Sequence, residues 1–270
     1  MSGAPPFAVH AVRFASRPGV RGQHFLGHDD RAGEAHPTAY YVWLATNADH
    51  VVLVDAGIDP ARPVPIDGIT FHRSPVEGLA ELGIRPEQVD YVVLSHLHYD
   101  HTGTVAAFPA ARYVVQRREL DYWTGPVAAR IRREHWLVSR EDVGHLTGPA
   151  RSRLDLVDGS AEVVPGLEVH HVGGHTAGMQ VVRVRTAAGP VVLASDAAHY
   201  YANLQRRSPF PIVYNVGDMA VGWETIERLA GHPDRFIPGH DPIVTEIYPR
   251  ASDKVDAWAL HLPPSKSFAK

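Results

Sequence analysis

The feature that most constrains this fold is an apolar strand that runs directly into a cluster of metal-ligating side chains. Residues 91–95 ("YVVLS") are followed by "HLHYDHTG", which places His96, His98, Asp100 and His101 within six residues. Side chains two positions apart on an extended chain point to the same side, so these groups can converge. Because the strand is apolar on both faces, we expect it in the middle of a sheet, covered by helices.

Three later segments also place a ligand after an apolar run. "GGHTAG" carries His175, "VLASDAA" carries Asp196 and "IPGHD" carries His240. A hydrogen-bonded loop would explain the first cluster alone, but not ligands at four separate strand ends. An unpaired buried polar group costs about 1–3 kcal/mol, so one cation would leave part of this set uncompensated. The seven groups therefore predict two divalent metal ions.

The absence of cysteine limits the chemistry of this site. Disulfides, thiolate ligands and a cysteine nucleophile are all excluded, so nitrogen and oxygen must hold the metals. Imidazole and carboxylate together favour zinc, and manganese, iron and cobalt are alternatives because ligand softness does not decide between them.

Charge patterning excludes several classes of partner. The 26 basic and 30 acidic residues give a formal charge of −4, without a run of five like charges. The sequence therefore lacks the clustered positive charge that would bind nucleic acid or an anionic membrane, and a small-molecule substrate fits better. The N-terminus lacks a signal-peptide pattern, and no segment reaches the roughly 18 apolar residues of a membrane helix. We expect a cytoplasmic protein.

Strand and helix signals occur in two series. In the first, residues 40–46 and 51–55 form an antiparallel pair, and a short helix at 74–84 precedes the strand at 91–95. In the second, a hairpin turns at "AAG" within 181–196, and a helix ends at Gly231. Two sheets packed together under outer helices would explain this order. No linker interrupts the chain, so we expect one domain over 1–270, with a helical insertion near 117–148.

These motifs resemble those of the metallo-β-lactamase-fold hydrolases. The matches are "SHLHYDH" (the family's HxHxDH), "GGHTAG", "SD" and "PGHD", in the family's order, and "VLVDAG" is similar to its first motif. The resemblance implies an α/β fold, a four-layer αβ/βα sandwich of two mixed β-sheets flanked by helices. It also implies that Asp55 braces the ligand loop, and it assigns one metal to His96, His98 and His175, the other to Asp100, His101 and His240, and the bridging position to Asp196.

Such a site predicts hydrolysis. Two cations about 3.5–4 Å apart can hold a bridging hydroxide near neutral pH, which attacks a carbonyl without any serine or cysteine nucleophile. By analogy with the family, Asp100 is also a catalytic residue that carries a proton to the leaving group.

Several branches of the fold do not fit this chain. Thiolate-using β-lactamases need a cysteine where Asp196 stands, RNA-processing members need a basic exosite, and flavodiiron proteins need a flavodoxin domain. "SDAAHYYAN" and "PFPIVYNVG" resemble instead the N-acyl-homoserine-lactone lactonases, the quorum-quenching group, which open a lactone ring. Members often carry a tyrosine three residues after the bridging aspartate. Here that residue is His199, so either His199 or Tyr200 would contact the substrate carbonyl, and an aromatic wall is the alternative for both.

The substrate is therefore predicted to be an acyl-homoserine-lactone-like or other small lactone. The alternative is another ester, a thioester as in glyoxalase II, or an amide. In the stretch "YPRASDKVDAW" near the C-terminus, only Arg250 and Lys254 offer positive charge for a glutathione-like thioester. A metal-dependent binding domain without catalysis is a third reading, although such proteins usually lose ligands.

Apolar side chains on loops are candidates for the substrate cleft as a group, although each alone is more often a core or dimer contact: Phe25, Leu26, Tyr122, Trp123, Trp136, Phe210 and Tyr214. Family analogy suggests a homodimer through the N-terminal segment or the insertion. Other histidines lack spaced partners and are interpreted as structural: His10, His24, His28, His50, His72, His135, His145 and His232.

Overall fold

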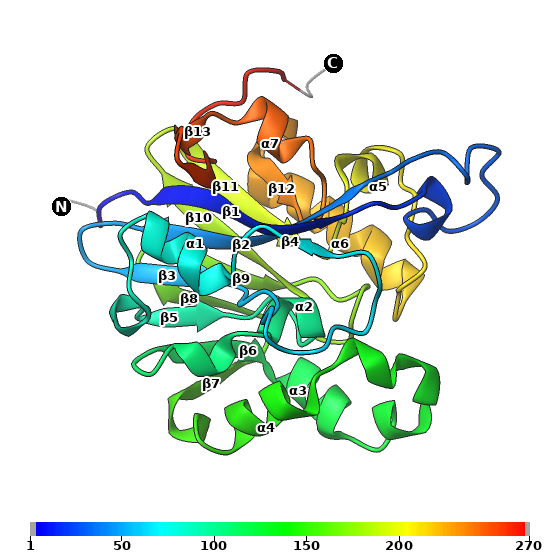
Figure 1. Cartoon of the computed structure of the whole chain (residues 1–270), viewed down its shortest axis with the longest axis horizontal. Coiled ribbons are helices and arrows are strands. Elements are labelled where there is room, and N and C mark those ends of the chain that lie inside the picture. The colour runs from blue at the N-terminus through cyan, green and yellow to red at the C-terminus, as the bar shows by residue number, and fades with distance from the viewer. Residues whose placement is uncertain (1–3, 268–270) are drawn as a thin grey trace.

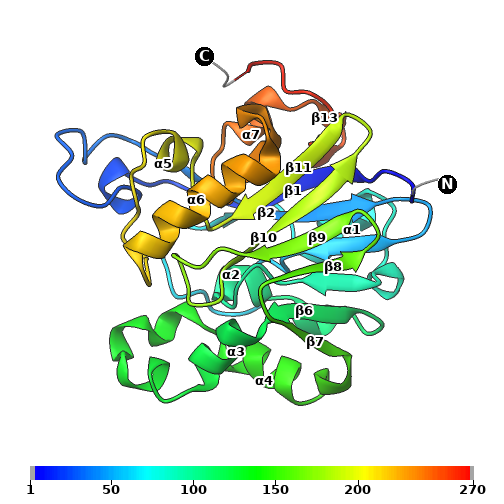
Figure 2. The same ribbon diagram turned by 180° about the vertical axis from the view of Figure 1, so that it is seen from behind.

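Two β-sheets pack face to face in the computed structural model, which describes residues 4–267 (Figures 1 and 2). The first sheet has nine strands in the order β13-β14-β1-β2-β3-β5-β6-β7, with β4 paired to β1. Its strands are β1 (Ala8–Arg17), β2 (Thr38–Thr46), β3 (Val51–Val54), β4 (Thr70–Phe71), β5 (Tyr91–Val93), β6 (Arg112–Gln116), β7 (Leu154–Val157), β13 (Arg250–Ser252) and β14 (Val255–Ala259).

The second sheet has five strands in the order β12-β11-β10-β9-β8. They are β8 (Ser160–Val164), β9 (Leu167–His171), β10 (Gln180–Thr186), β11 (Gly189–Ser195) and β12 (Phe236–Pro238). The α-helices are α1 (Pro75–Glu81), α2 (Tyr99–Thr102), α3 (Arg117–Thr124), α4 (Arg140–Thr147), α5 (Tyr201–Gln205), α6 (Val216–Ala230) and α7 (Val244–Ile247).

Helices cover the outer face of each sheet. Leu79 of α1, Leu120 of α3 and Leu146 of α4 share one buried cluster with the first sheet, and Trp223 of α6 belongs to the cluster that includes the second sheet. Figure 2 shows α6 lying across β10 and β11. These layers confirm the predicted αβ/βα sandwich. Within residues 4–267, no helix has the length and apolar character needed to cross a membrane.

The predicted local elements are largely present. Strands β2 and β3 pair antiparallel, and the β10–β11 hairpin turns between Thr186 and Gly189. Helix α1 begins at a Ser74–Glu77 capping box, in which each side chain accepts a hydrogen bond from the other residue's backbone N–H. Helix α6 ends at Gly231, whose φ of +66° is the left-handed conformation that favours glycine.

Strand β1 and its partner β14 were not predicted from the sequence. Strand β1 lies between β2 and β14, so it is central to the first sheet. Its pairing with β2 shifts register between Arg13 and Ala15, and this bulge interrupts the alternation of polar and apolar residues. The period-two signal of a half-buried strand is therefore weakened in "AVHAVRFASR".

The chain direction brings several strand ends to one edge. Strands β3, β5 and β6 run parallel, as do β11 and β12 in the other sheet. The residues that follow β3, β5, β11 and β12 therefore meet where the two sheets abut. Residues 117–148 contain α3, α4 and the short 3-10 helices Ala128–Arg130 and Arg132–Leu137. This segment lies at the bottom of the molecule in Figure 1.

Candidate metal centre

All seven predicted ligands lie together at this edge. Ligand atoms of His96, His98 and His175 fall within 4.8 Å of one another, and so do those of Asp100, His101 and His240. These are the two groups that the family resemblance implies. Asp196 lies between them, with Oδ1 3.1 Å from His240 Nε2 and Oδ2 3.4 Å from His175 Nε2.

The donor set fits divalent cations. His96 Nε2, His101 Nε2 and Asp196 Oδ1 are buried and have no hydrogen-bond partner among the described residues. Buried polar atoms without partners are costly, and a cation bound by these atoms would remove that cost. Imidazole nitrogens and carboxylate oxygens are also the ligands that zinc and related metals use.

The protonation preferences differ between the two groups. Burial holds the pKa of His96 and His98 well below the usual histidine range and lowers that of His175 to about 3, so these rings are neutral and keep a lone pair for a metal. In the other group, neighbouring carboxylates outweigh burial and raise the pKa of His101 and His240. This half of the centre therefore attracts positive charge.

Asp55 follows β3 and holds the ligand loop from below. It is fully buried and has a φ of +60°, uncommon for a residue other than glycine. Its carboxylate accepts hydrogen bonds from the Ser95 backbone N–H (2.7 Å), from the Ser95 and Ser195 hydroxyls (2.9 Å each) and from His101 Nδ1 (2.8 Å). Asp55 thus fixes the ring of one ligand and the segments that lead to two others, in agreement with its predicted role.

Glu119 of α3 plays a similar part that sequence reasoning missed. Its fully buried carboxylate accepts hydrogen bonds from the backbone N–H groups of Leu97 (3.0 Å) and Gly178 (2.8 Å) and from Trp123 Nε1 (2.8 Å). Leu97 lies between two ligands, and the Gly178 loop carries His175. A Cβ at Gly178 would lie 2.3 Å from the Glu119 nitrogen, so only glycine allows this approach. Glu119 lies in the charged run "RREL", where nothing in the sequence distinguishes a buried acid from an exposed one.

Replacing Glu119 with glutamine is expected to weaken metal binding by about 10- to 100-fold, since residues that orient metal ligands contribute at this level. An amide cannot accept from all three donors without turning its own NH2 toward one of them. Competition with a chromophoric chelator would measure the affinity. Glu224→Gln, at an exposed position of α6, is the matched control. An unchanged affinity in a folded Glu119→Gln protein would contradict this role.

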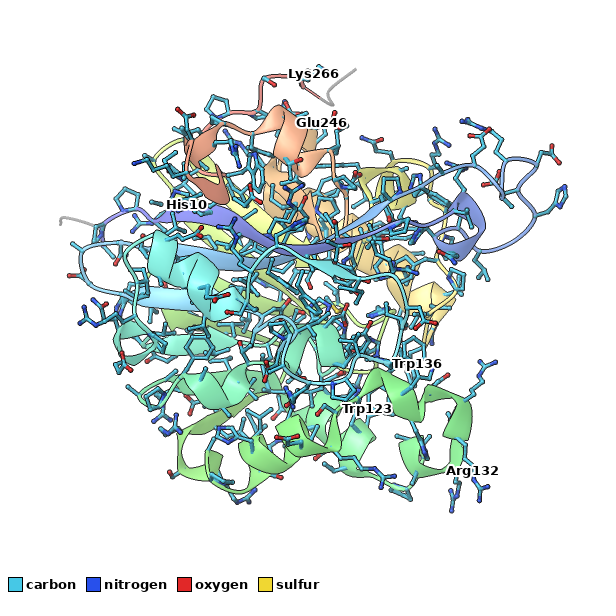
Figure 3. The ribbon with its side chains drawn as sticks, in the orientation of Figure 1. His10, Trp123, Arg132, Trp136, Glu246 and Lys266 are labelled. Carbon is cyan, nitrogen blue, oxygen red and sulfur yellow. The ribbon has the colours of Figure 1, made fainter. Side chains whose placement is uncertain are left out.

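A cavity of about 220 Å³ opens above the ligands. Its apolar side is formed by Trp136, Leu137 and Ile212. His199 also lines this cavity, next to the ligands. A second cavity of about 220 Å³ shares these three apolar residues and is also lined by Tyr122, Trp123 and Tyr214. Figure 3 shows Trp123 and Trp136 on the helical insertion, with Arg132 at its outer end.

The remaining predicted wall residues lie elsewhere. Phe210 is buried beneath His199, with the two rings stacked at 3.6 Å. Phe25 is buried against Tyr200, and Leu26 is exposed. Neither Phe25 nor Leu26 is among the residues that line the two cavities.

The two candidate carbonyl donors are placed differently. His199 lines the cavity, and its Nε2 lies 3.0 Å from Asp196 Oδ2. Tyr200 is buried, and its hydroxyl lies 3.0 Å from Thr38 Oγ1 and 3.1 Å from the Pro37 carbonyl, to which it donates. The Tyr200 hydroxyl is therefore engaged outside the cavity, whereas the His199 ring faces it.

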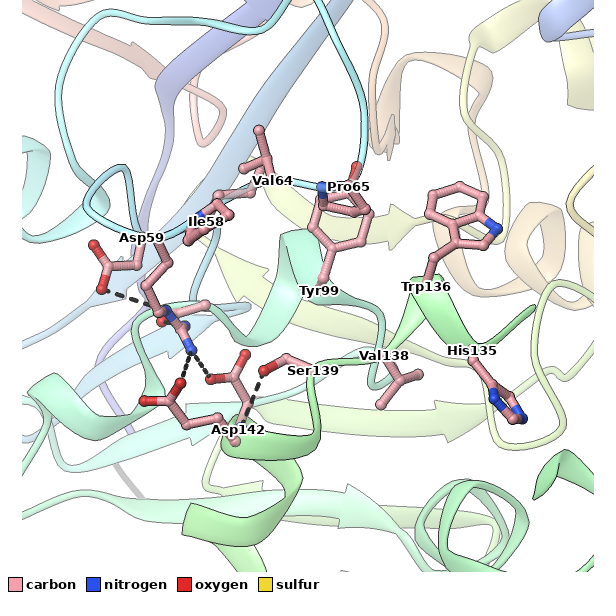
Figure 4. Close-up of a pocket in the computed structure, with 14 residues that line it drawn as sticks. Ile58, Asp59, Val64, Pro65, Tyr99, His135, Trp136, Val138, Ser139 and Asp142 are labelled. Carbon is pink, nitrogen blue, oxygen red and sulfur yellow. Dashed lines mark hydrogen bonds and ion pairs between the residues drawn. The ribbon is translucent and has the colours of Figure 1, made fainter. Parts of the chain in front are cut away.

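A third cavity, of about 420 Å³, is lined by residues that include Trp136 and Tyr99 (Figure 4). Arg62 pairs there with Asp142 at 2.7 Å, and Asp142 also accepts a hydrogen bond from Thr102 at 2.8 Å. Thr102 belongs to α2, which carries Asp100 and His101. The hydrogen bond from Thr102 therefore connects α4 to the ligand helix, and the ion pair connects α4 to the loop that carries Arg62.

A family model and several known proteins are similar to this chain. The family model described as the metallo-beta-lactamase superfamily matches residues 33–240. An N-acyl homoserine lactonase from Bacillus sp. is 31% identical over 194 residues, covering 66% of this chain and 71% of that protein.

Solved structures show the same fold. A quorum-quenching N-acyl homoserine lactone lactonase aligns with a TM-score of 0.73 at 20% identity over 89% of this chain and 95% of its own. AidC, a dizinc quorum-quenching lactonase in complex with a product, aligns with a TM-score of 0.71 at 14% identity over 88% of each chain.

Proposed function

Because the chain belongs to the metallo-beta-lactamase superfamily, we propose that this hydrolase opens the ring of a small lactone at a centre of two divalent metal ions. The observation that carries this proposal is the pair of buried ligand groups with Asp196 between them. The similarity to N-acyl homoserine lactonases favours a lactone over other esters. Zinc is the preferred metal, supported by the nitrogen and oxygen donors and by the dizinc relative.

The proposed ligand assignment follows the two groups. His96, His98 and His175 would hold one ion, Asp100, His101 and His240 would hold the other, and Asp196 lies between the two groups as a ligand available to either. Ions bound there would supply a hydroxide nucleophile near neutral pH and a Lewis acid for the carbonyl. Ligand loops fixed by Asp55 and Glu119 keep this geometry constant during turnover.

The chain's own residues complete the reaction. Asp100 is the least buried of the ligands and lines the cavity, so its carboxyl group can pass a proton to the alkoxide that leaves when the ring opens. His199 Nε2 is hydrogen-bonded to Asp196 Oδ2 at 3.0 Å, and if Asp196 bound a metal this N–H would be released to donate to the substrate carbonyl. The aromatic side formed by Trp123, Trp136 and Tyr214 takes the acyl substituent and excludes water from the centre.

Acid release from a panel of γ-lactones, thioesters and cephalosporins tests this function. The purified, metal-loaded protein is expected to prefer γ-lactones, because ring opening requires the centre and a small cavity but no thiol-binding subsite. The measurement is kcat/KM for each substrate by pH-stat titration. A preference for thioesters of more than tenfold would replace the lactonase assignment with a thioesterase on the same fold. The homodimer and the cytoplasmic location remain predictions.

A further inference from the structure

The cavity above the ligands has a cationic side that the proposed reaction does not use. Arg17 is the last residue of β1 and pairs in register with Thr38, the first residue of β2. Both residues line the cavity, together with Gln23 and Tyr40. These polar residues line the same space as the ligands Asp100, Asp196 and His240 and as the apolar side formed by Trp136, Leu137 and Ile212.

The charge of Arg17 is not neutralised within the protein. Several other partly buried arginines reach a carboxylate, as Arg13 does with Asp256 and Arg62 with Asp142. Two more, Arg153 and Arg235, donate to backbone carbonyls instead. Among residues 4–267, no carboxylate lies within 4.0 Å of the Arg17 guanidinium. Its Nε is buried without a hydrogen-bond partner. A half-buried guanidinium that lacks an acid therefore faces the reaction cavity.

The neighbours of Arg17 hold it in place. It lies beside the Tyr40 hydroxyl, where burial raises the pKa of the phenol and the arginine charge opposes that rise. The Tyr40 ring packs edge-on against His240, with ring centroids 5.0 Å apart. On its other side, the Arg17 side-chain stem lies 3.8 Å from the position that a Cβ of Gly68 would occupy. The side chain thus runs between the 55–69 loop and the wall of the metal centre.

We propose that Arg17 binds a negatively charged group of the substrate, so that the enzyme acts best on lactones carrying a carboxylate or an equivalent anion near the ring. This inference rests on the proposed lactone hydrolysis. A guanidinium recognises a carboxylate through two parallel N–H···O bonds, and its weak hydration favours such pairing in a partly buried site. Because the cavity is small, the anion and the ring must be joined by a short chain.

The substrate would then lie across the cavity in one orientation. Its anionic group contacts Arg17 and Tyr40, its carbonyl lies over the centre, and any apolar part contacts Trp136 and Leu137. A neutral lactone would leave the guanidinium without a partner after water is expelled, which disfavours binding. Arg17 thereby sets specificity without taking part in bond cleavage.

The test compares a γ-lactone whose short side chain ends in a carboxylate with the corresponding primary carboxamide. The wild-type enzyme is expected to prefer the carboxylate. Arg17→Gln should lower kcat/KM for the carboxylate by about 10- to 100-fold, mainly through KM, the size expected for one charge-assisted pair. Hydrolysis of the carboxamide should change less than about threefold. Arg17→Lys should keep part of the preference, and Arg132→Gln, at the exposed end of the insertion, is the control (Figure 3).

Two outcomes would overturn the proposal while leaving lactone hydrolysis intact: equal rates on both lactones in the wild type, or equal losses on both in Arg17→Gln. If neither lactone is hydrolysed, the proposed function fails instead. In that case, a binding measurement tests the anion site separately. Titration calorimetry would use 1-butanesulfonate, an anion that binds metals weakly. Binding of 1-butanesulfonate to the wild type but not to Arg17→Gln supports the site. No binding to either protein contradicts it.

Discussion

Replacing Asp196 with alanine is expected to lower kcat/KM by about 10³-fold or more while the chain remains folded. Among residues 4–267, Asp196 is the one carboxylate that approaches both ligand groups, and nearby histidines led by His240 hold its pKa well below the usual range despite burial. Without it, two cations would face each other with less negative charge between them. His101→Ala should have a comparable effect, because it removes a ligand and breaks the bond to Asp55.

Steady-state kinetics on the preferred lactone would measure the loss, and metal analysis of the same samples would show whether an ion is lost. Asp121→Ala, at an exposed position of α3, is a matched control and should behave as wild type. Circular dichroism checks that each variant is folded. Near-normal rates in Asp196→Ala or in His101→Ala would remove that residue from the mechanism.

Removal of the metals is expected to abolish hydrolysis and to lower thermal stability. The active protein should contain close to two ions per chain by plasma mass spectrometry. A ligand present at 100 times its Kd stabilises the native state by about 2.7 kcal/mol per site, so chelation should shift Tm downward by several degrees. Adding back zinc, manganese or cobalt one at a time would identify the metals that restore the rate.

The control for this experiment is the His101→Ala protein, whose Tm should respond less to chelator because it already lacks a ligand. Fully active wild-type protein with at most one ion per chain would contradict the dinuclear proposal. Activity that survives exhaustive chelation would contradict any metal-dependent reaction.

Much of the centre could be predicted because its ligands follow apolar strands. Alternation on an extended chain brings His96 and His98 together, and parallel strands deliver Asp196 and His240 to the same edge. Such regularities depend on local backbone geometry, which a single sequence records. The hairpin at Thr186 and the helix end at Gly231 are predictable for the same reason.

Other features depend on contacts between distant segments. Glu119 was missed because its hydrogen bonds join helix α3 to two distant loops, and the local sequence is simply charged. The choice between His199 and Tyr200 could not be made because it depends on Thr38, which lies 162 positions from Tyr200. Strand β1 was missed because a bulge disrupts its alternation.

The contact between Ser95 and Ser195 has a consequence for how the protein matures in a cell. These hydroxyls lie 2.9 Å apart, each bonded to Asp55, and they join the end of β5 in one sheet to the end of β11 in the other. The first half of the chain supplies four of the ligands and the second half supplies three, the last being His240. Under the proposed ligand assignment, a nascent polypeptide still missing its second half would have no complete coordination sphere. Loading with ions would then be a late step of biosynthesis, reached only by chains whose two halves have already docked.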